Sequence, residues 1–425
     1  MALPLEGISV LDFSQGEFGP YCAMMLADMG ADVIKIERPD IGEGWRYGGL
    51  NSVAPGLSNM FLAINRGKRS LAIDIREPEG RDAVYRLVRE ADVVLHNMRP
   101  GVMERLGFGY AKLSELNPAI VMCSESAYGE TGPHAQRGGQ DLLTQAFSGI
   151  IALQGYEDAP PRAVGTPIAD GVGAITASWG IMLALFVRER TGVGQEVTTN
   201  LFDALLALSP MDFCDYLMSG RRYKGGRGWY PQMPYGPWQA KDRAVVVNLQ
   251  GDVAWPAFCH ITGTEAHVAD PRFATNAQRL MHRRELEALL DPVFAGRTAA
   301  EWRAAFEAEG LRCDPVNDYA DIEADPQTTI NEMIVEQEHP AYGKLRTVGM
   351  AIKLKKTPGR AGGPRGLAAP TLGEHTREIL EDLGYDDGEI ADYERRNLVN
   401  TTGPVNVEAA MAALRDQRAA TPRPL

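Results

Sequence analysis

Short apolar runs alternate with longer amphipathic segments along the first third of the chain. The intervening segments 21–30 and 78–91 place their apolar residues on one side of a helix. Strands that alternate with helices form parallel sheets with both faces covered. The pattern therefore predicts an α/β fold with a parallel-sheet, Rossmann-like large domain. The predicted strands, each rich in aliphatic residues, are residues 8–13, 31–37, 70–74, 92–96 and 119–123.

The pattern changes after residue 219. Residues 220–242 are rich in glycine and proline, which predicts a loop-rich connector. A strand at 244–248 and the helices beyond it indicate a second, smaller α+β domain that ends near Asp325. Residues 347–353 are predicted to return to the first domain as a strand. The other predicted elements are a strand at 195–199 and helices at 101–106, 140–149, 170–188, 201–218 with a break at Pro210, 253–262, 283–294, 299–309 and 373–384.

One apolar stretch approaches the length of a membrane span. Residues 171–187 carry no charge, but Thr176, Ser178 and Gly180 interrupt them. The stretch is also shorter than the roughly 20 apolar residues that a span needs. We therefore expect a buried core helix. The first residues show no basic cluster followed by an apolar run, so no export signal is predicted and the expected location is cytoplasmic.

Composition excludes several classes of function. The chain has 43 basic and 56 acidic residues, a net charge of −13, which argues against a nucleic-acid partner. The seven histidines show no metal-ligand spacing, so no metal centre is predicted. A small anionic ligand held by local arginines stays possible. The five cysteines form no C-x-x-C pair and fit reduced thiols: Cys22, Cys123, Cys214, Cys259 and Cys313.

Asp170 stands among small residues in the segment GTPIADGVG, at the predicted start of the uncharged helix. Backbone N–H groups and the positive helix end are expected to keep its carboxylate ionised. Gly171 and Gly173 add no side-chain bulk, so a substrate carbonyl could approach closely. The residue types fit two roles, a helix cap and a nucleophile, and helix caps are far commoner.

The first strand, turn and helix invite comparison with a dinucleotide site. Glu37 lies about 20 residues after the turn, where a ribose ligand is expected. The turn reads GEFG at residues 16–19, however, and lacks the G-x-G-x-x-G pattern, and Glu17 would bring negative charge to a pyrophosphate. A nicotinamide-dependent dehydrogenase is thus a poorly supported alternative.

Arginines that follow the predicted strands suggest a different anion site. Ligands of open parallel sheets bind at the carboxyl ends of the strands, where these side chains could converge on a phosphate-bearing ligand. The alternative is that each is a solvated surface residue. Asn97 also follows a strand and is compatible with a simple turn role. The arginines in question are Arg38, Arg76, Arg99 and Arg105.

Several segments, in order along the chain to about Val399, resemble the class III CoA-transferase family, which includes formyl-CoA transferase, carnitine-CoA transferases and α-methylacyl-CoA racemase. They are VLDF at 10–13, GP at 19–20, GADVIKIER at 30–38, NRGKRS at 65–70, NMRPGVMERLG at 97–107, TGVGQ at 191–195 and LGEHT at 372–376. The resemblance implies an interlocked homodimer and a small domain inserted into a large one. The expected division is 1–224 and 326–400 for the large domain, 225–325 for the small domain with its connector, and 401–425 for a peripheral tail.

The resemblance also implies a reaction. In the transferases an aspartate that matches Asp170 attacks an acyl-CoA thioester, giving an aspartyl-acyl anhydride and then an aspartyl-CoA thioester. Coenzyme A is then a substrate held by the protein, and a carboxylic acid is the other substrate. The residues implied to bind CoA are Gln15, Gly16, Glu17, Phe18, Arg38, Ile73, Asp74, Ile75, Arg76, Asn97, Met98, Arg99 and Arg105.

Two departures bear on the substrate. Gln15 and Glu17 stand where formyl-CoA transferase has a histidine and a glutamine, and that enzyme's glycine-run loop has no clear counterpart, since the glycines at 225–228 come earlier. Formate and oxalate are therefore doubtful as substrates. The racemases need a histidine in a Gly-His-Asp segment, and this chain has Gly139-Gln140-Asp141 there. Because a glutamine cannot exchange a proton near neutral pH, transfer is favoured over racemisation.

Several side chains near the expected site could have either a functional or a structural role. Gln140 and Asp141 could line the acyl pocket, or Asp141 could cap the helix that follows it. His134 could replace the missing racemase histidine only if its loop rearranged. The aromatic residues of the connector could shape a pocket for a larger acid or could simply pack at a domain junction. They are Trp229, Tyr230, Tyr235 and Trp238.

Overall fold

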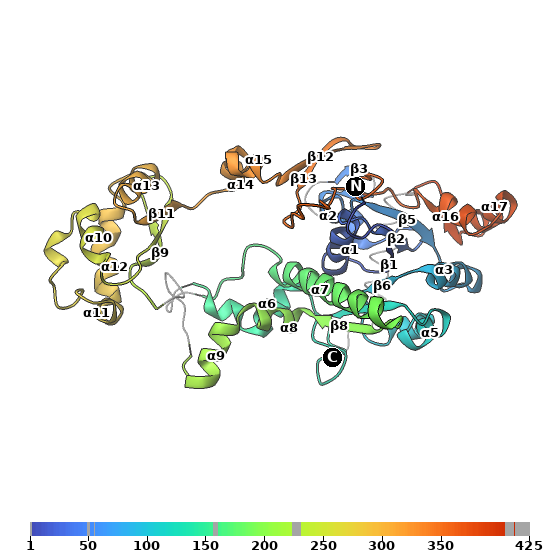
Figure 1. Cartoon of the computed structure of the whole chain (residues 1–425), viewed down its shortest axis with the longest axis horizontal. Helices are drawn as coiled ribbons and strands as arrows, with labels where there is room; N and C mark the ends of the chain where they lie inside the picture. Colours follow the sequence, from blue (N-terminus) through green and yellow to red (C-terminus); the bar gives the residue numbers. More distant parts are fainter. Residues whose placement is uncertain are drawn as a thin grey trace. The chain divides into compact units, whose positions relative to one another are not determined.

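The computed structural model describes residues 2–48, 52–54, 56–155, 160–222 and 231–403, together with residue 412. The chain divides into two compact units (Figure 1). The larger is built from three segments, 1–148, 164–213 and 329–425, and the smaller from 149–163 and 214–328.

A seven-stranded sheet forms the centre of the large unit, with strand order β14, β5, β2, β1, β6, β7, β8. All neighbours pair in parallel except β14, which joins β5 antiparallel. The predicted α/β fold with a mostly parallel sheet is confirmed. The strand order reverses between β1 and β6. The strands are β1 Ser9–Asp12, β2 Asp32–Glu37, β5 Lys68–Ile73, β6 Val93–His96, β7 Val121–Ser126, β8 Glu196–Asn200 and β14 Val399–Asn400.

Helices cover both faces of this sheet (Figure 1). Two small antiparallel hairpins, β3 with β4 and β12 with β13, lie apart from it. The helices of the large unit are α1 Phe18–Asp28, α2 Asn59–Ile64, α3 Pro78–Glu90, α4 Val102–Leu106, α5 Tyr110–Leu116, α6 Asp141–Ser148, α7 Ile168–Thr191, α8 Leu201–Leu208, α16 Thr376–Asp382 and α17 Asp387–Arg395. The hairpin strands are β3 Ser52–Ala54, β4 Leu57–Ser58, β12 Ile334–His339 and β13 Gly343–Val348, and a 3₁₀ turn, η1, covers Gly44–Tyr47.

The two faces of the sheet differ in chemistry because successive side chains of a strand point to opposite faces. One face carries aliphatic and aromatic residues such as Leu11, Ile34 and Leu71, which pack with residues of α3, α5, α16 and α17. The other face carries alternate residues of the same strands and is covered by α1, where the Lys68 ammonium donates to the Pro20 carbonyl at 2.8 Å. Its carboxyl-terminal half is rich in buried charge.

Lys35, Lys68 and the carboxylates beside them form buried ion pairs on the second face. The Lys68 Nζ lies 2.9 Å from Asp12 Oδ2, and Lys35 Nζ lies 3.8 Å from the same oxygen and 3.7 Å from Glu43 Oε1. Burial opposes ionisation of Asp12, but the two lysines hold the pKa of this carboxyl below its usual value. Because a buried charge without a partner is costly, the network ties β1, β2 and β5 to the segment before η1.

The small unit has its own core around a three-stranded antiparallel sheet in the order β11, β10, β9. Trp238, Phe258 and Trp302 are buried there with Phe294, and the Trp238 and Phe294 rings stack with centroids 5.0 Å apart. Its elements are η2 Ile150–Leu153, β9 Tyr235–Gln239, β10 Ala244–Asn248, α10 Trp255–Thr262, η3 Glu265–His267, α11 Asn276–Met281, α12 Arg283–Phe294, α13 Ala299–Ala308, β11 Arg312–Pro315 and α14 Tyr319–Ala324. The helices α9 Pro210–Ser219 and α15 Pro326–Ile330 cross between the two units along the chain.

Several elements differ from their sequence predictions. The connector contains strand β9, and the small unit begins at Cys214 rather than at 225 and includes 149–163. The strand predicted at 347–353 ends at Val348 and pairs with β12, not with the main sheet. The place beside β5 is taken by the two-residue strand β14, which is too short to show a periodic pattern.

The uncharged helix α7 is only partly buried. By length and composition it could cross a membrane, but one of its faces packs inside the large unit through Ala174, Ala177 and Ile181. The prediction of a buried helix is therefore confirmed for that face only. The opposite face exposes large apolar side chains at helical spacing, namely Ile175, Trp179, Met182, Leu183, Phe186 and Val187.

Candidate functional site

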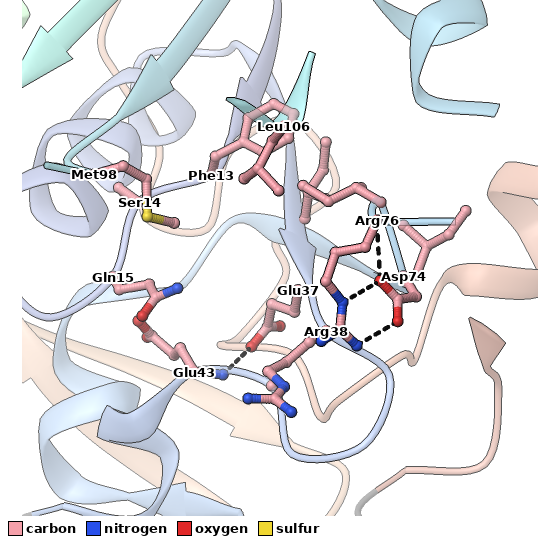
Figure 2. A pocket seen from close by; sticks show the side chains of 14 residues that line it. Phe13, Ser14, Gln15, Glu37, Arg38, Glu43, Asp74, Arg76, Met98 and Leu106 are labelled. Carbon is pink, nitrogen blue, oxygen red and sulfur yellow. Dashed lines mark hydrogen bonds and ion pairs between the residues drawn. The ribbon is translucent and has the colours of Figure 1, made fainter. Parts of the chain in front are cut away.

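A cavity of about 240 Å³ opens at the carboxyl ends of the parallel strands (Figure 2). This is where open α/β sheets bind ligands. Figure 2 shows Gln15 and Met98 on one side of it and Arg76 with Asp74 on the other. It is lined by Phe13, Ser14, Gln15, Ile36, Glu37, Arg38, Gly42, Glu43, Ile73, Asp74, Ile75, Arg76, Met98 and Leu106.

Two of the four candidate arginines reach this cavity. Arg38 forms a two-point pair with Asp40, at 2.6 and 2.5 Å, and Arg76 forms one with Asp74, at 2.8 and 2.5 Å. The Arg76 guanidinium lowers the pKa of Asp74, mainly through these hydrogen bonds. Each guanidinium carries five N–H groups, so both keep donors for an anionic ligand.

The other two arginines lie outside the lining of this cavity. The Arg99 guanidinium lies beside Gly138, and that of Arg105 lies beside Gly101 at the start of α4. The predicted convergence of four arginines is thus met by Arg38 and Arg76 only. Gly16, Glu17, Phe18 and Asn97 are likewise not part of the lining.

Phe18 has a packing role. Its buried ring lies against Gly173 of α7, where an added Cβ would come within 2.7 Å of the ring. The space at Gly173, expected to admit a substrate carbonyl, is filled by the Phe18 ring. Gly171 is different, because a Cβ there would meet nothing within 4 Å. Open space therefore lies at Gly171, the residue after Asp170, and not at Gly173.

Asp170 is the third residue of α7, which begins at Ile168 after Pro167. Burial, followed by the negative charge of Asp141, raises the pKa of its carboxyl to about 7. The helix end therefore does not hold the pKa of Asp170 in its usual range, although a large fraction of the carboxyl is still ionised at neutral pH. Asp141 also occupies the backbone donors at the helix start, since its Oδ1 accepts from the N–H of Ala169 at 2.6 Å and of Asp170 at 3.4 Å.

Asp141 thus caps α7, although it lies in the first turn of α6. Its other oxygen accepts from Gln145 Nε2 at 2.6 Å, and Gln145 Oε1 accepts from the Val164 N–H at 3.0 Å. Gln145 is buried and was missed by the sequence analysis, because a glutamine inside an amphipathic helix gives no signal. The Gln140 side chain is exposed.

The negative charge of Asp170 acts on two further carboxyl groups. Burial, then Asp170 and Asp141, raises the pKa of Glu17 to about 7. Glu125, near the end of β7, is 1% exposed, and neither of its oxygens has a hydrogen-bond partner in the described part of the chain. Burial, then the charges of Asp12 and Asp170, raises the pKa of Glu125 well above its usual range. Nothing in the sequence pattern distinguished it.

The remaining candidates lie elsewhere. The His134 ring packs against Phe147 with centroids 4.9 Å apart, so it belongs to an aromatic cluster. Trp238 is buried in the core of the small unit, which supports packing for this residue, and Tyr235 is in the same strand. Trp229 and Tyr230 lie outside the described residues. Within the described ranges no group of three or more His, Cys, Asp or Glu could hold a metal ion.

Known proteins are similar to this chain in sequence and in fold. The family model described as CoA-transferase family III matches residues 5–376. An acyl-CoA transferase of Fusarium pseudograminearum is 37% identical, covering 93% of this chain and 88% of that protein, and a succinyl-CoA:glutarate CoA-transferase of Mus musculus is 33% identical, covering 91% and 88%. The crystal structure of a CAIB/BAIF family protein from Brucella suis is 31% identical with a TM-score of 0.81, covering 90% of this chain and 100% of that one.

Proposed function

The chain belongs to CoA-transferase family III, and from this premise we propose that it moves CoA from an acyl-CoA thioester to a free carboxylic acid through Asp170. The observation that carries the proposal is the state of that side chain. Its pKa of about 7 leaves a large ionised fraction at neutral pH, and the space at the next residue, Gly171, is open. A carboxylate in this state is a competent nucleophile.

The proposed reaction exchanges one activated ester for another. An oxygen of Asp170 attacks the thioester carbonyl, the C–S bond breaks, and CoA leaves as a thiolate, so that the acyl group and Asp170 form a mixed anhydride. The thiolate then attacks the Asp170 carbonyl carbon and releases the first acid as a carboxylate. An incoming carboxylate reverses these steps with the aspartyl-CoA thioester. Both intermediates hydrolyse if water enters, so the half-buried setting of Asp170 favours transfer over hydrolysis.

We propose that the cavity in Figure 2 takes part of the CoA molecule. Arg38 and Arg76 are suited to its phosphates, because each has N–H groups beyond those that bind its carboxylate partner. The apolar walls given by Ile73, Ile75 and Met98 suit the uncharged parts of the ligand.

The rate of the first half-reaction should depend on pH through Asp170. Only the ionised carboxylate attacks, so the rate from acyl-CoA is expected to rise with pH and level off above about 7. Glu17 titrates in the same range, so the observed midpoint belongs to the pair. Asp141→Asn keeps the oxygen that accepts from Ala169 and removes the charge that raises the pKa of Asp170. The midpoint should therefore move to lower pH.

The measurement is the pH profile of single-turnover CoA release. Glu115→Gln removes an exposed carboxylate that pairs with Lys112 and is the matched control, with an unchanged midpoint expected. An Asp141→Asn profile that stays in place or moves to higher pH would contradict the assignment.

The donor and acceptor acids are tested by a matrix of acyl-CoAs and free acids read by mass. Succinyl-CoA with glutarate belongs in the matrix because a relative is named for that pair. CoA appearing on the acceptor is the expected result for at least one pair. Hydrolysis without exchange for every pair would reject transfer. Racemisation would instead show as deuterium uptake at the α-carbon, which the exposed Gln140 and the packed His134 do not support.

We also propose that the protein is a homodimer, as the family resemblance implies, and that a second copy covers the apolar face of α7. Trp179 is 66% exposed and Phe186 is 55% exposed, which is unusual for such side chains on a free surface.

The double variant Trp179→Glu with Phe186→Glu should weaken association at least about tenfold, because burying two carboxylates in an apolar contact is costly. Sedimentation of the wild type, the double variant and a Glu189→Gln control tests this. A wild-type monomer would contradict the dimer, and flotation of the wild type with lipid vesicles would contradict the covering of this face by a second copy.

A further inference from the structure

The turn between β1 and α1, residues 14–16, is held along its backbone by side chains from separate segments. Asp12 Oδ1 accepts from the Ser14 N–H at 2.9 Å, and Lys35 Nζ donates to the Ser14 carbonyl at 2.9 Å. Glu43 Oε2 accepts from the Gly16 N–H at 3.0 Å. The buried charges of the second sheet face therefore fix both ends of this turn.

Asn97 holds the middle of the turn with both groups of its amide. Its Oδ1 accepts from the Gln15 N–H at 2.8 Å, and its Nδ2 donates to the Gln15 carbonyl at 2.6 Å. A donor and an acceptor on the same residue fix which way the amide points. The side-chain amide of Asn97 thereby pairs with the Gln15 backbone as the peptide group of a neighbouring strand would.

This pair stands where the strand order reverses. The last backbone bond from the end of β1 to β6 runs from the Phe13 N–H to the Leu95 carbonyl at 2.8 Å. Beyond it the two chain segments diverge, to α1 on one side and to α4 on the other. The side chain of Asn97 continues the link across the crevice in which such sheets bind their ligands.

The turn also joins the cavity to the nucleophile. Gln15 lines the cavity, and Phe18, three residues later, packs on Gly173 of α7. Gly173 and Asp170 lie three residues apart, on the same face of that helix. A shift of the turn would therefore change the position of the cavity relative to the Asp170 carboxyl.

We propose that Asn97 is a positioning residue that braces Gln15 and so sets the alignment between bound CoA and Asp170, rather than a residue that binds CoA with its amide. The inference rests on the proposed function for its effect on rate. Its structural half, the bracing of the turn, is independent of that function. Because a displacement of about 1 Å in a reacting geometry can cost about 10²-fold in rate, a small loss of bracing should reduce turnover far more than it reduces binding.

The test compares Asn97→Ala, Asn97→Asp and the wild type. Asn97→Ala should speed hydrogen exchange in the peptide that contains Gln15 and Gly16, lower kcat by about 10- to 100-fold and leave the calorimetric Kd for CoA nearly unchanged. Asn97→Asp keeps the acceptor for the Gln15 N–H and loses the donor, so its kcat should lie between the other two.

Asn117→Ala is the matched control. Asn117 also donates to backbone carbonyls, but these are the carbonyls of Val88 and Ala91 and not those of the turn at residues 14–16. It should lower thermal stability while leaving exchange at the turn and kcat unchanged.

Three results would overturn the proposal: unchanged exchange at the turn in Asn97→Ala, unchanged kcat despite faster exchange, or a Kd for CoA that rises in step with the loss of rate. The last would make Asn97 a CoA ligand. A wild-type protein that binds CoA without transferring it would reject the proposed function instead, and the exchange measurement would still decide whether Asn97 braces the turn.

Discussion

Asp170→Ala should lose CoA transfer by a factor on the order of 10⁴ or more, because no other group can form the acyl and CoA esters in its place. Binding of CoA should persist, since the cavity is lined by residues from the ends of β1, β2, β5 and β6 and does not include Asp170. Initial transfer rates and calorimetric CoA affinity, measured on the same preparation, check both parts. A variant that retains more than a few per cent of the wild-type rate would rule out the proposed nucleophile.

Asp170→Asn separates a lost nucleophile from a damaged fold. The carboxyl of Asp170 holds its proton more tightly in the folded protein, with a pKa of about 7, than in the unfolded chain, where about 4 is usual. Folding stability from this group is therefore present below about pH 4 and is lost as the pH rises to about 7. Asp170→Asn should be more stable than the wild type above pH 7 and equal to it in acid, while remaining inactive. Thermal unfolding at several pH values measures the difference.

Arg46→Met should lower the free energy of unfolding by about 3–5 kcal/mol, the usual result of breaking one side of a buried ion pair. Arg46 is fully buried, and its Nε and NH2 bind the two oxygens of Glu37 at 2.7 and 2.6 Å. It also donates to the Pro370 carbonyl at 3.0 Å and lies over the Phe61 ring at 3.9 Å. Methionine would leave the Glu37 carboxylate buried without its main partner. Urea unfolding measures the loss.

The control is Arg395→Met, which breaks an ion pair with Asp392 of similar length, 2.8 Å, at an exposed position. Exposed pairs contribute little, so its unfolding midpoint should stay at the wild-type value. The double variant Arg46→Met with Glu37→Met should recover much of the loss, because it removes the stranded charge. Equal effects of Arg46→Met and Arg395→Met would show that the buried pair is not a main support of this fold.

The main sheet could be predicted because β1, β2, β5, β6 and β7 each contain a short apolar run. Strands β9 and β14 could not. Tyr235–Gln239 contains glycine and proline, and Val399–Asn400 has two residues, so neither shows a period. Both are strands only because a neighbour pairs with them: β10 beside β9, and β5 beside β14. Pairing between distant segments is not visible in local sequence.

The sequence allowed individual residues of the candidate site to be predicted. Asp170 stood out by its setting, and Arg38 and Arg76 by their place after strands. The pKa of Asp170 was not predictable, because it depends on burial and on Asp141, 29 residues earlier in the chain, which takes the helix donors. The packing of Phe18 on Gly173 was not predictable either. It shows that this glycine makes room for an aromatic ring and not for a substrate.

The most direct measurement is trapping of the enzyme with acyl-CoA and hydroxylamine, followed by peptide mass spectrometry. Hydroxylamine attacks the Asp170 carbonyl carbon of the anhydride or of the CoA thioester and leaves a hydroxamate there. A mass change is therefore expected only in the peptide that contains Asp170. The label should be absent in Asp170→Ala and should require acyl-CoA. Active transfer with an unlabelled Asp170, or with the label on Glu17 or Asp141, would contradict the account.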